Sequence, residues 1–131
     1  MSNEIKEILS YKRVAVVGIS RDESKAAHFV PKYLLEHGYD IIPINPFADE
    51  ILGKKCYKSL DEVKEEIDIV DVFRPSDQVM QVVKEAIKKK PKAIWLQLGI
   101  KNEEASKEAL RHGIKFIQDK CMMEEHIRLM K

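Results

Sequence analysis

Short apolar segments alternate along the chain with longer amphipathic segments. Five runs rich in branched residues predict strands buried on both faces, at about residues 13–18, 40–44, 69–73, 93–98 and 114–118. Apolar side chains at helical spacing predict helices at about residues 3–11, 24–37, 79–90, 102–112 and 122–130. One more helix is predicted where S-L-D-E places Ser59 and Glu62 at capping-box spacing.

This alternation predicts an α/β fold, a Rossmann-like doubly wound five-stranded parallel sheet with helices on both faces. We expect the strand order 3-2-1-4-5, which places a crevice at the carboxyl ends of the first and fourth strands. Pro43 lacks a backbone donor and fits poorly in a central strand, so we expect it where the second strand ends. With 131 residues and no linker or repeat, the chain is expected to form a single domain, 1–131.

The stretch R-V-A-V-V-G-I-S-R-D-E-S joins the first strand to a polar loop. Gly18 allows a sharp turn and a close approach of the backbone to a ligand. Ser20 offers a hydroxyl group, and Arg21 and Lys25 offer positive charge. Ser24 is predicted to cap the following helix. Phosphate is the ligand expected at such a helix N-terminus, although a plain strand-to-helix turn has the same pattern.

Charge restricts the partners of the protein. The formal net charge is +1, so no overall field attracts nucleic acid or an anionic membrane, and neither is an expected partner. Charged residues make up 34% of the chain, many of them Lys and Glu, which favours a thermophilic source.

The two cysteines, Cys56 and Cys121, lie far apart and form no C-x-x-C pair, so neither a zinc site nor a disulfide framework is predicted. The first residues, M-S-N-E-I-K-E, contain no apolar signal-peptide core, and no apolar run has the length of a membrane span. We therefore expect a cytoplasmic protein with reduced thiols.

A nicotinamide dinucleotide is the common ligand of such a sheet, but the sequence departs twice from its fingerprint. The loop reads G-I-S-R-D-E instead of G-x-G-x-x-G, and the second strand ends in P-I-N-P without an acidic residue for a ribose diol. Both departures argue against NAD. Arg21, Lys25 and Arg74 instead favour a ligand with more phosphate charge.

Several motifs together resemble one family. They are G-I-S-R, Y-D-I-I-P-I-N-P, G-K-K-C-Y-K-S-L, I-V-D-V-F-R, W-L-Q-L-G-I-x-N-E-E-A and D-K-C-M-M-E-E-H, which span about residues 11–129. The set resembles the stand-alone CoA-binding domain proteins of bacteria and archaea. That family is similar to the CoA-binding domains of succinyl-CoA synthetase and of ADP-forming acyl-CoA synthetases. The resemblance implies a Rossmann-like fold that binds coenzyme A, with the ADP part near the glycine loop and the pantetheine arm along the strand ends.

The residues that follow each strand are the candidate CoA contacts. Phosphate groups are assigned to Gly18, Ser20, Arg21 and Lys25, the adenine or ribose to Asn45 and Pro46, a wall of the nucleotide site to Phe73, Arg74 and Pro75, and the amide-bearing arm to Gln97 and Gly99. Each has a plainer alternative: Asn45 shapes a turn, Phe73 belongs to the core, and Gln97 bonds a nearby backbone group.

Cys121 is the last candidate contact. It follows the fifth strand, near where the pantetheine thiol ends in the synthetase domains that this chain resembles. A mixed disulfide with CoA is the functional hypothesis, and a small buried cysteine is the alternative. Lys120 and the start of the last helix are expected to lower the pKa of the Cys121 thiol.

No catalytic or metal-binding set is apparent. Spacing typical of a Ser–His–Asp triad or of metal ligands does not occur around His28, His37, His112 or His126. We therefore expect a non-catalytic protein that binds CoA or acyl-CoA. The alternatives are a subunit of an acyl-CoA-processing enzyme and a different nucleotide-binding Rossmann module. The acyl group, the pathway and the choice between a homodimer and a partner enzyme subunit stay open.

Overall fold

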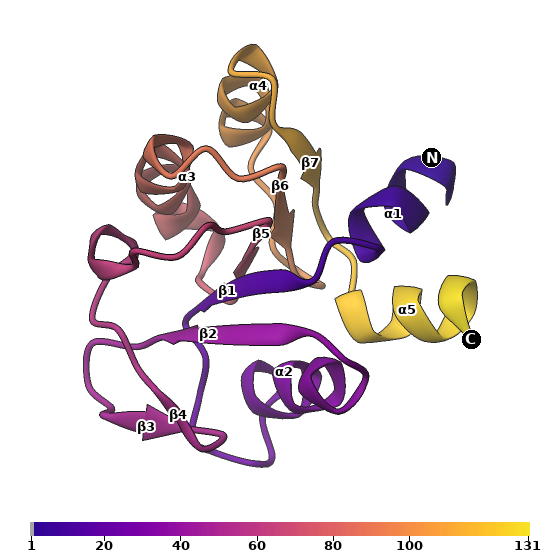
Figure 1. Ribbon diagram of the computed structural model, residues 1–131. Helices are drawn as coiled ribbons and strands as arrows, with labels where there is room; N and C mark the ends of the chain where they lie inside the picture. The colour runs from indigo at the N-terminus through magenta and orange to yellow at the C-terminus, as the bar shows by residue number, and fades with distance from the viewer. Residues whose placement is uncertain (1) are drawn as a thin grey trace.

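The computed structural model describes residues 2–131 and contains a five-stranded parallel sheet between two layers of helices (Figure 1). The strands of the sheet are β1 (Arg13–Val17), β2 (Asp40–Ile44), β5 (Ile69–Val72), β6 (Ala93–Leu96) and β7 (Lys115–Ile117). The helices are α1 (Ser2–Leu9), α2 (Ala26–Glu36), α3 (Val79–Lys88), α4 (Glu103–Arg111) and α5 (Met122–Met130). The predicted fold class, an α/β Rossmann-like sheet with helices on both faces, is confirmed.

The smaller elements lie in the connections. They are the hairpin strands β3 (Glu50–Ile51) and β4 (Lys54–Lys55) and the 3₁₀ turns η1 (Leu60–Glu62) and η2 (Ser76–Gln78). Leu52 and Gly53 both have positive φ and form the two-residue turn of the hairpin, where a loop with a turn-like Gly53 was predicted.

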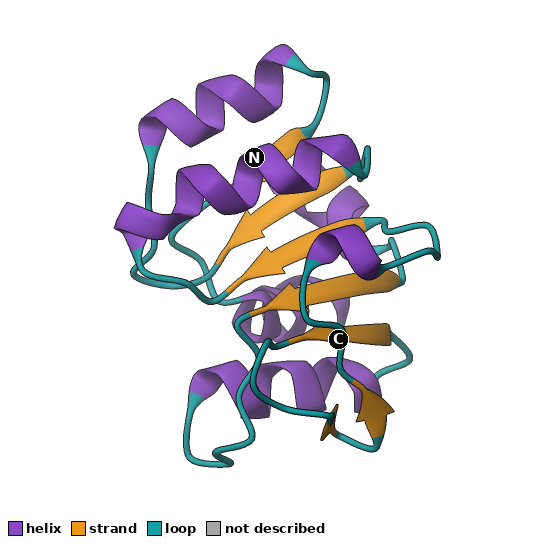
Figure 2. Cartoon of the chain, turned by 90° about the vertical axis from the view of Figure 1, so that its left-hand side faces the viewer, coloured by secondary structure: helices purple, strands orange, loops and turns teal. Residues whose placement is uncertain are grey.

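Helices cover both faces of the sheet (Figure 2), and one apolar core packs on each face. Buried side chains of α1, α2 and α5 pack on one face around Trp95, whose indole N–H donates to the Lys120 carbonyl at 2.8 Å. Side chains of α3, α4 and η1 pack on the other face. All residues of β5 and β6 are buried, as expected for central parallel strands, and Asp71 of β5 is the polar residue among them.

The predicted strand order is wrong in detail. The sheet runs β2-β1-β5-β6-β7, so the third parallel strand of the chain pairs with β1 and not with β2. The outer edge of β2 is blocked by the chain itself, because the Tyr57 N–H donates to the Pro43 carbonyl and the Tyr57 carbonyl accepts from Asn45, both at 2.9 Å. Pro43 has no N–H for that edge, which suits an edge strand. The crevice therefore lies between β1 and β5, the switch point of this strand order.

Two predictions about helix starts need correction, and one is confirmed. The Asn102 side chain accepts from the Ala105 N–H and caps α4, as predicted. Ser24 does not cap α2, because its N–H and hydroxyl both bond to the Asp22 carboxylate. Ser59 starts only the short turn η1, after which Val63 is extended.

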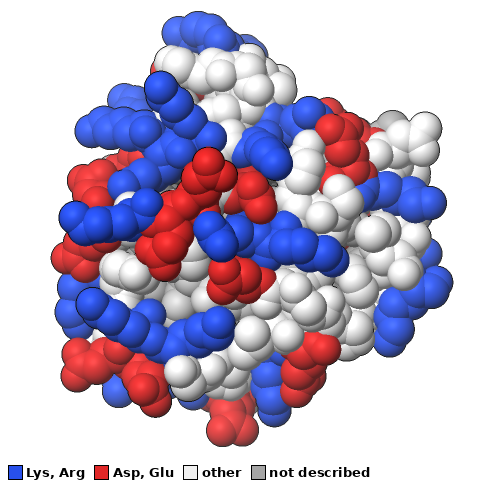
Figure 3. Space-filling model, viewed as in Figure 1, with Lys and Arg blue, Asp and Glu red and all other residues white. Residues whose placement is uncertain are grey.

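Figure 3 shows charged side chains of both signs intermixed over one face, as expected for a net charge of +1. No helix within residues 2–131 is long and apolar enough to cross a membrane.

The junction between β1 and β5 is too close for a side chain on Gly18. A Cβ atom there would lie 2.5 Å from the Phe73 carbonyl oxygen and 3.0 Å from the Cδ atom of Arg74. Gly18 also has φ of +89°, a conformation that L-residues rarely adopt. Two independent constraints therefore require glycine at this position: the positive φ and the lack of room for a Cβ atom beside the Phe73 carbonyl.

We expect Gly18→Ala to lower the free energy of unfolding by about 3 kcal/mol or more, because left-handed strain adds to a backbone clash. Gly53→Ala is the matched control. Gly53 also has positive φ but no atom within 4 Å of a Cβ, so it should lose only about 1 kcal/mol. Urea denaturation of both variants measures the difference, and equal losses would show that the β1–β5 contact is not tight.

Candidate functional site

Two cavities open at the carboxyl ends of the strands, one on each face of the sheet. The larger, about 420 Å³, is named here the polar cleft and lies on the α3 side. Its walls include Gly18 at the end of β1, Pro46 and Phe47 after β2, Ser59 before η1, Arg74 after β5, and Gln81 and Glu85 of α3. Backbone, aromatic and polar groups therefore meet at the switch point between β1 and β5, not between the first and fourth strands as predicted.

Two cations face the polar cleft. Arg74 is held by a hydrogen bond from its guanidinium to the Gln78 side chain. Lys58 lies across the cleft, with its Nζ 3.3 Å from the Ala48 carbonyl oxygen and 3.5 Å from an Asp49 carboxylate oxygen. Arg74 is half-buried and Lys58 is exposed, so both side chains are available to the phosphate groups of a ligand.

The smaller cavity, about 200 Å³, is named the apolar pocket and lies on the α2 and α5 side. It is lined by Ala26, Phe29, Val30, Phe73, Gln97, Leu98, Ile100, Cys121, Met123 and Glu124. Phe73 and Arg74 are neighbours in the chain yet line different cavities, so the end of β5 separates the two.

The loop between β1 and α2 is fixed by the protein itself. The His28 ring bonds to the Ser20 carbonyl oxygen at 2.7 Å, and the Ser20 hydroxyl accepts from the Asp22 N–H at 3.0 Å. Arg21 and Lys25 are exposed on this loop and line neither cavity. No side chain caps α2, and its first turn carries no acidic residue, so its positive end is open to an anion.

Asn45 joins two loops of the site. Its amide nitrogen donates to the Ile19 carbonyl at 2.8 Å, and its oxygen accepts from the N–H groups of Phe47 at 2.7 Å and Ala48 at 3.1 Å. The side chain thus shapes the turn after β2 and attaches it to the glycine loop. This geometry supports the plainer of the two alternatives for Asn45.

Gln97 is buried, and both ends of its amide are bonded inside the protein. Its nitrogen donates to the Asp71 carboxylate, and its oxygen accepts from the Met122 N–H at 3.2 Å. The second Asp71 oxygen is buried without a hydrogen-bond partner. Burial raises the pKa of Asp71 to about 7, while the Gln97 hydrogen bond acts weakly in the opposite direction.

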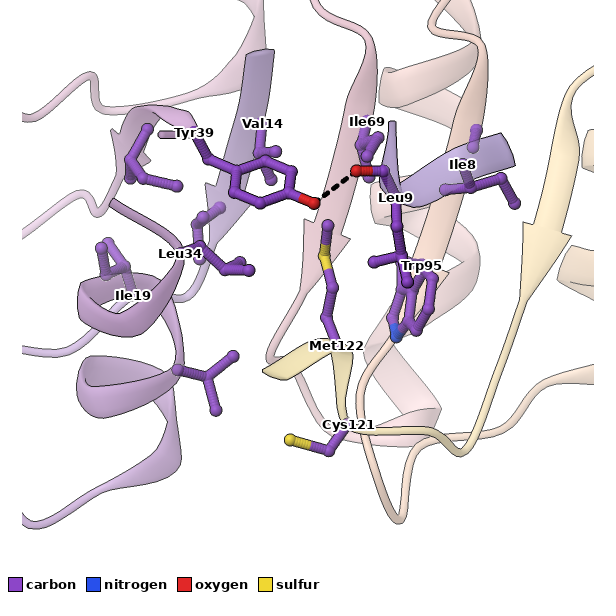
Figure 4. Packing of buried hydrophobic residues seen from close by; sticks show 14 of the residues in the cluster. Ile8, Leu9, Val14, Ile19, Leu34, Tyr39, Ile69, Trp95, Cys121 and Met122 are labelled. Atoms are coloured by element: carbon purple, nitrogen blue, oxygen red, sulfur yellow. Dashed lines mark hydrogen bonds between the residues drawn. The ribbon is translucent and has the colours of Figure 1, made fainter. Parts of the chain in front are cut away.

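Cys121 lies at the edge of the core, and Figure 4 shows it below Met122, with its sulfur on the side of α2. Burial raises the pKa of the Cys121 thiol, and the charges of Glu124 and Asp71 act in the same direction. The backbone N–H groups of Glu124 and Met123 at the start of α5 lower the pKa, but less than burial raises it. The predicted low pKa is therefore wrong, although the helix start acts in the predicted sense.

Gly99 and Pro75 complete the strand ends. Gly99 is exposed, with φ of +86°, and its N–H donates to the Asp119 carboxylate at 2.7 Å. Pro75 is exposed and precedes η2. Neither lines one of the two cavities.

Half of the predicted contacts, all at or after the carboxyl ends of strands, line one of the two cavities. Gly18, Pro46 and Arg74 line the polar cleft, and Phe73, Gln97 and Cys121 line the apolar pocket. The cavities also contain residues that the sequence analysis missed, chiefly Lys58 and Phe47 in the polar cleft and Phe29 and Leu98 in the apolar pocket. Lys58 stands in the motif G-K-K-C-Y-K-S-L, which was the available clue.

The remaining histidines have structural partners. His126 bonds to the Tyr33 hydroxyl at 2.7 Å, and the rings of His37 and His112 each bond a backbone carbonyl one turn earlier. Within residues 2–131, no three His, Cys, Asp or Glu side chains are grouped so as to hold a metal ion.

Comparison with known sequences gives a consistent result. The sequence model of the family described as "CoA binding domain" matches residues 12–127. The uncharacterized protein YneT of Bacillus subtilis is 44% identical over 124 residues, which cover 94% of this chain and 92% of that protein. The ADP-forming acetate–CoA ligase of Methanocaldococcus jannaschii is 37% identical over 136 residues, which cover 96% of this chain but 19% of the ligase.

Solved structures agree. A hypothetical protein from Pyrococcus horikoshii OT3 superimposes with a TM-score of 0.96 at 44% identity, covering 100% of this chain and 93% of that one. The dinucleotide-forming acetyl-coenzyme A synthetase 1 of Ca. Korarchaeum cryptofilum, in complex with phosphate and ADP, superimposes with a TM-score of 0.75 at 30% identity, over 89% of this chain and 28% of the synthetase. The chain therefore matches small proteins over nearly their whole length and the ligases over a minor part.

We expect the contribution of Asp71 to the free energy of unfolding to fall as pH rises from 3.8 to about 7. The folded protein keeps the Asp71 proton up to pH about 7, whereas an unfolded aspartate releases it near 3.8, so the folded state binds more protons between these values. Replacing the acid with Asp71→Asn removes this dependence. The free energy of unfolding of Asp71→Asn relative to wild type should rise from pH 4 to pH 8 by up to about 4 kcal/mol.

Guanidinium denaturation at several pH values measures this difference. Asp61→Asn, at an exposed aspartate of η1, is the control and should follow wild type. Parallel pH curves for wild type and Asp71→Asn would show that Asp71 is ionised in the fold.

Proposed function

Since the chain belongs to the family of CoA-binding domains, we propose that it binds coenzyme A or acyl-CoA between the ends of β1 and β5, without catalytic residues of its own. The observation that carries the proposal is that a cavity with two cations and an apolar cavity lie on either side of the end of β5, next to Gly18. CoA is a ligand of this kind, since its nucleotide is anionic and its thiol end is not. In this role CoA is a ligand or substrate and not a resident cofactor.

The nucleotide is assigned to the polar cleft. Arg74 and Lys58 supply positive charge, and Pro46 and Phe47 supply an apolar surface for the base. The pyrophosphate lies over the β1–α2 loop, where Arg21, Lys25 and the uncapped end of α2 offer charge and free N–H groups. The pantetheine arm then crosses the end of β5, and only its thiol end reaches the apolar pocket, at Cys121.

A role as an enzyme subunit is the second candidate. It is favoured by relatives such as the M. jannaschii ligase, of which this chain matches 19% of the length. In such a role the catalytic groups come from a partner chain. Turnover of acyl-CoA by the isolated chain would contradict a purely binding role, and turnover after addition of a partner would establish the second.

We expect CoA to bind with micromolar or better affinity and NAD far more weakly, because the fingerprint for a ribose diol is missing. Arg74→Ala and Lys58→Ala should each weaken CoA binding by about 10- to 100-fold, the loss of about 1.5 to 3 kcal/mol expected for one charge-assisted contact. Arg21→Ala and Lys25→Ala, on the exposed loop, should weaken it by several-fold. Isothermal titration measures all of these affinities.

Lys107→Ala is the control, because Lys107 is exposed on α4 and lines neither cavity. Equal affinity for CoA and NAD, or no CoA binding, would refute the proposed function. Unchanged affinity in all four cation variants would place the phosphates elsewhere.

We also propose that Cys121 forms a mixed disulfide with CoA when CoA disulfide is supplied. The Cys121 thiolate attacks one sulfur of the disulfide, a new S–S bond forms, and the second CoA leaves as its thiolate. Because the pKa of the thiol is raised, the adduct should form slowly at pH 7 and about tenfold faster at pH 8.

Intact-mass measurement detects the added CoA, and dithiothreitol should remove it. Cys56→Ser should keep the adduct and Cys121→Ser should lose it. An adduct in Cys121→Ser, or none in wild type at either pH, would end the hypothesis.

A further inference from the structure

The lining of the apolar pocket does not match the amide-bearing pantetheine arm, which the sequence analysis assigned to the strand ends at Gln97 and Gly99. Pantetheine carries two amides and a hydroxyl group, each of which needs a hydrogen-bond partner when it leaves water. Gln97 is the side-chain amide in the pocket, and its oxygen and nitrogen are already bonded to Met122 and Asp71. The pocket therefore suits a hydrocarbon group better than an amide-bearing one.

Two large apolar side chains lie exposed at this pocket. Phe29 of α2 is 42% exposed and Leu98, after β6, is 63% exposed. Both line the same cavity as Phe73 and Met123. An apolar group placed there would remove these side chains from water, which is the driving force for binding.

From these observations, and resting on the proposed function, we propose that the apolar pocket binds the acyl chain of a short, uncharged acyl-CoA thioester. The chain would extend past Cys121 from the thiol end of CoA, whose nucleotide lies across the end of β5 in the polar cleft. The pocket thereby makes the protein a receptor for acylated CoA in preference to free CoA.

The size and charge of the pocket define the acyl group. A volume of about 200 Å³ holds roughly six methylene groups, if each fills about the 30 Å³ of a liquid water molecule. Within residues 2–131, no Lys or Arg lines the pocket, and both polar atoms of the Gln97 amide are already bonded inside the protein. An acyl group that carries its own carboxylate would lose water there without a cation to pair with, and is therefore disfavoured.

Titration with CoA, acetyl-CoA, butyryl-CoA, hexanoyl-CoA and succinyl-CoA tests the proposal. Affinity should rise about fourfold for each added methylene as far as hexanoyl-CoA, as expected for transfer of a methylene from water. Succinyl-CoA, which matches butyryl-CoA in chain length, should bind at least tenfold more weakly than butyryl-CoA.

Two variants locate the chain. Leu98→Ser should reduce the gain per methylene, whereas Leu110→Ser, at an exposed leucine of α4 outside the pocket, should not.

The outcomes separate this inference from the proposed function. Tight binding of CoA without a gain from the acyl chain overturns the inference and leaves CoA binding in place. Equal affinity for succinyl-CoA and butyryl-CoA, or a gain per methylene that both variants retain, also overturns it. Failure of all five ligands to bind would refute the proposed function and the inference together.

Discussion

The ends of β1 and β5 lie so close that a Cβ atom on Gly18 would be 2.5 Å from the Phe73 carbonyl oxygen. This contact fixes the direction in which the chain leaves β5. Phe73 lines the pocket on the α2 side and Arg74 lines the cleft on the α3 side. One backbone contact thereby sets an aromatic ring and a cation on the two sides of the same crevice.

The fold class followed from the sequence because buried parallel strands have continuous apolar runs and the helices between them do not. The apolar runs did not determine the order of the strands, because the order depends on which strand edges are free to pair with another strand. Pro43 indicated the position of its strand, because a strand that lacks a backbone N–H suits the edge of a sheet. The predicted order 3-2-1-4-5 instead places the strand of Pro43 inside the sheet, whereas β2 lies at the edge. The bonds from Tyr57 that occupy this edge are long-range contacts that no local pattern shows.

The candidate site was predictable to the extent that it depends on topology. Carboxyl ends of parallel strands meet at one edge, so Gly18, Arg74 and Cys121 were identified before the structure was known. Side-chain roles were less predictable, because Gln97 and Asn45 form hydrogen bonds with partners distant in sequence. The thiol pKa was mispredicted for the same reason, since burial depends on the whole fold and outweighs the helix end.

The two cavities impose different requirements on a ligand. Phosphate groups require the polar cleft and the open end of α2, whereas the lining of the apolar pocket offers no Lys or Arg to a charged group within residues 2–131. A free nucleotide satisfies only the first requirement and a free acyl chain only the second. A molecule that joins an anionic nucleotide to an uncharged end through a flexible arm satisfies both, because the two cavities lie on either side of the end of β5 and one ligand can occupy them together.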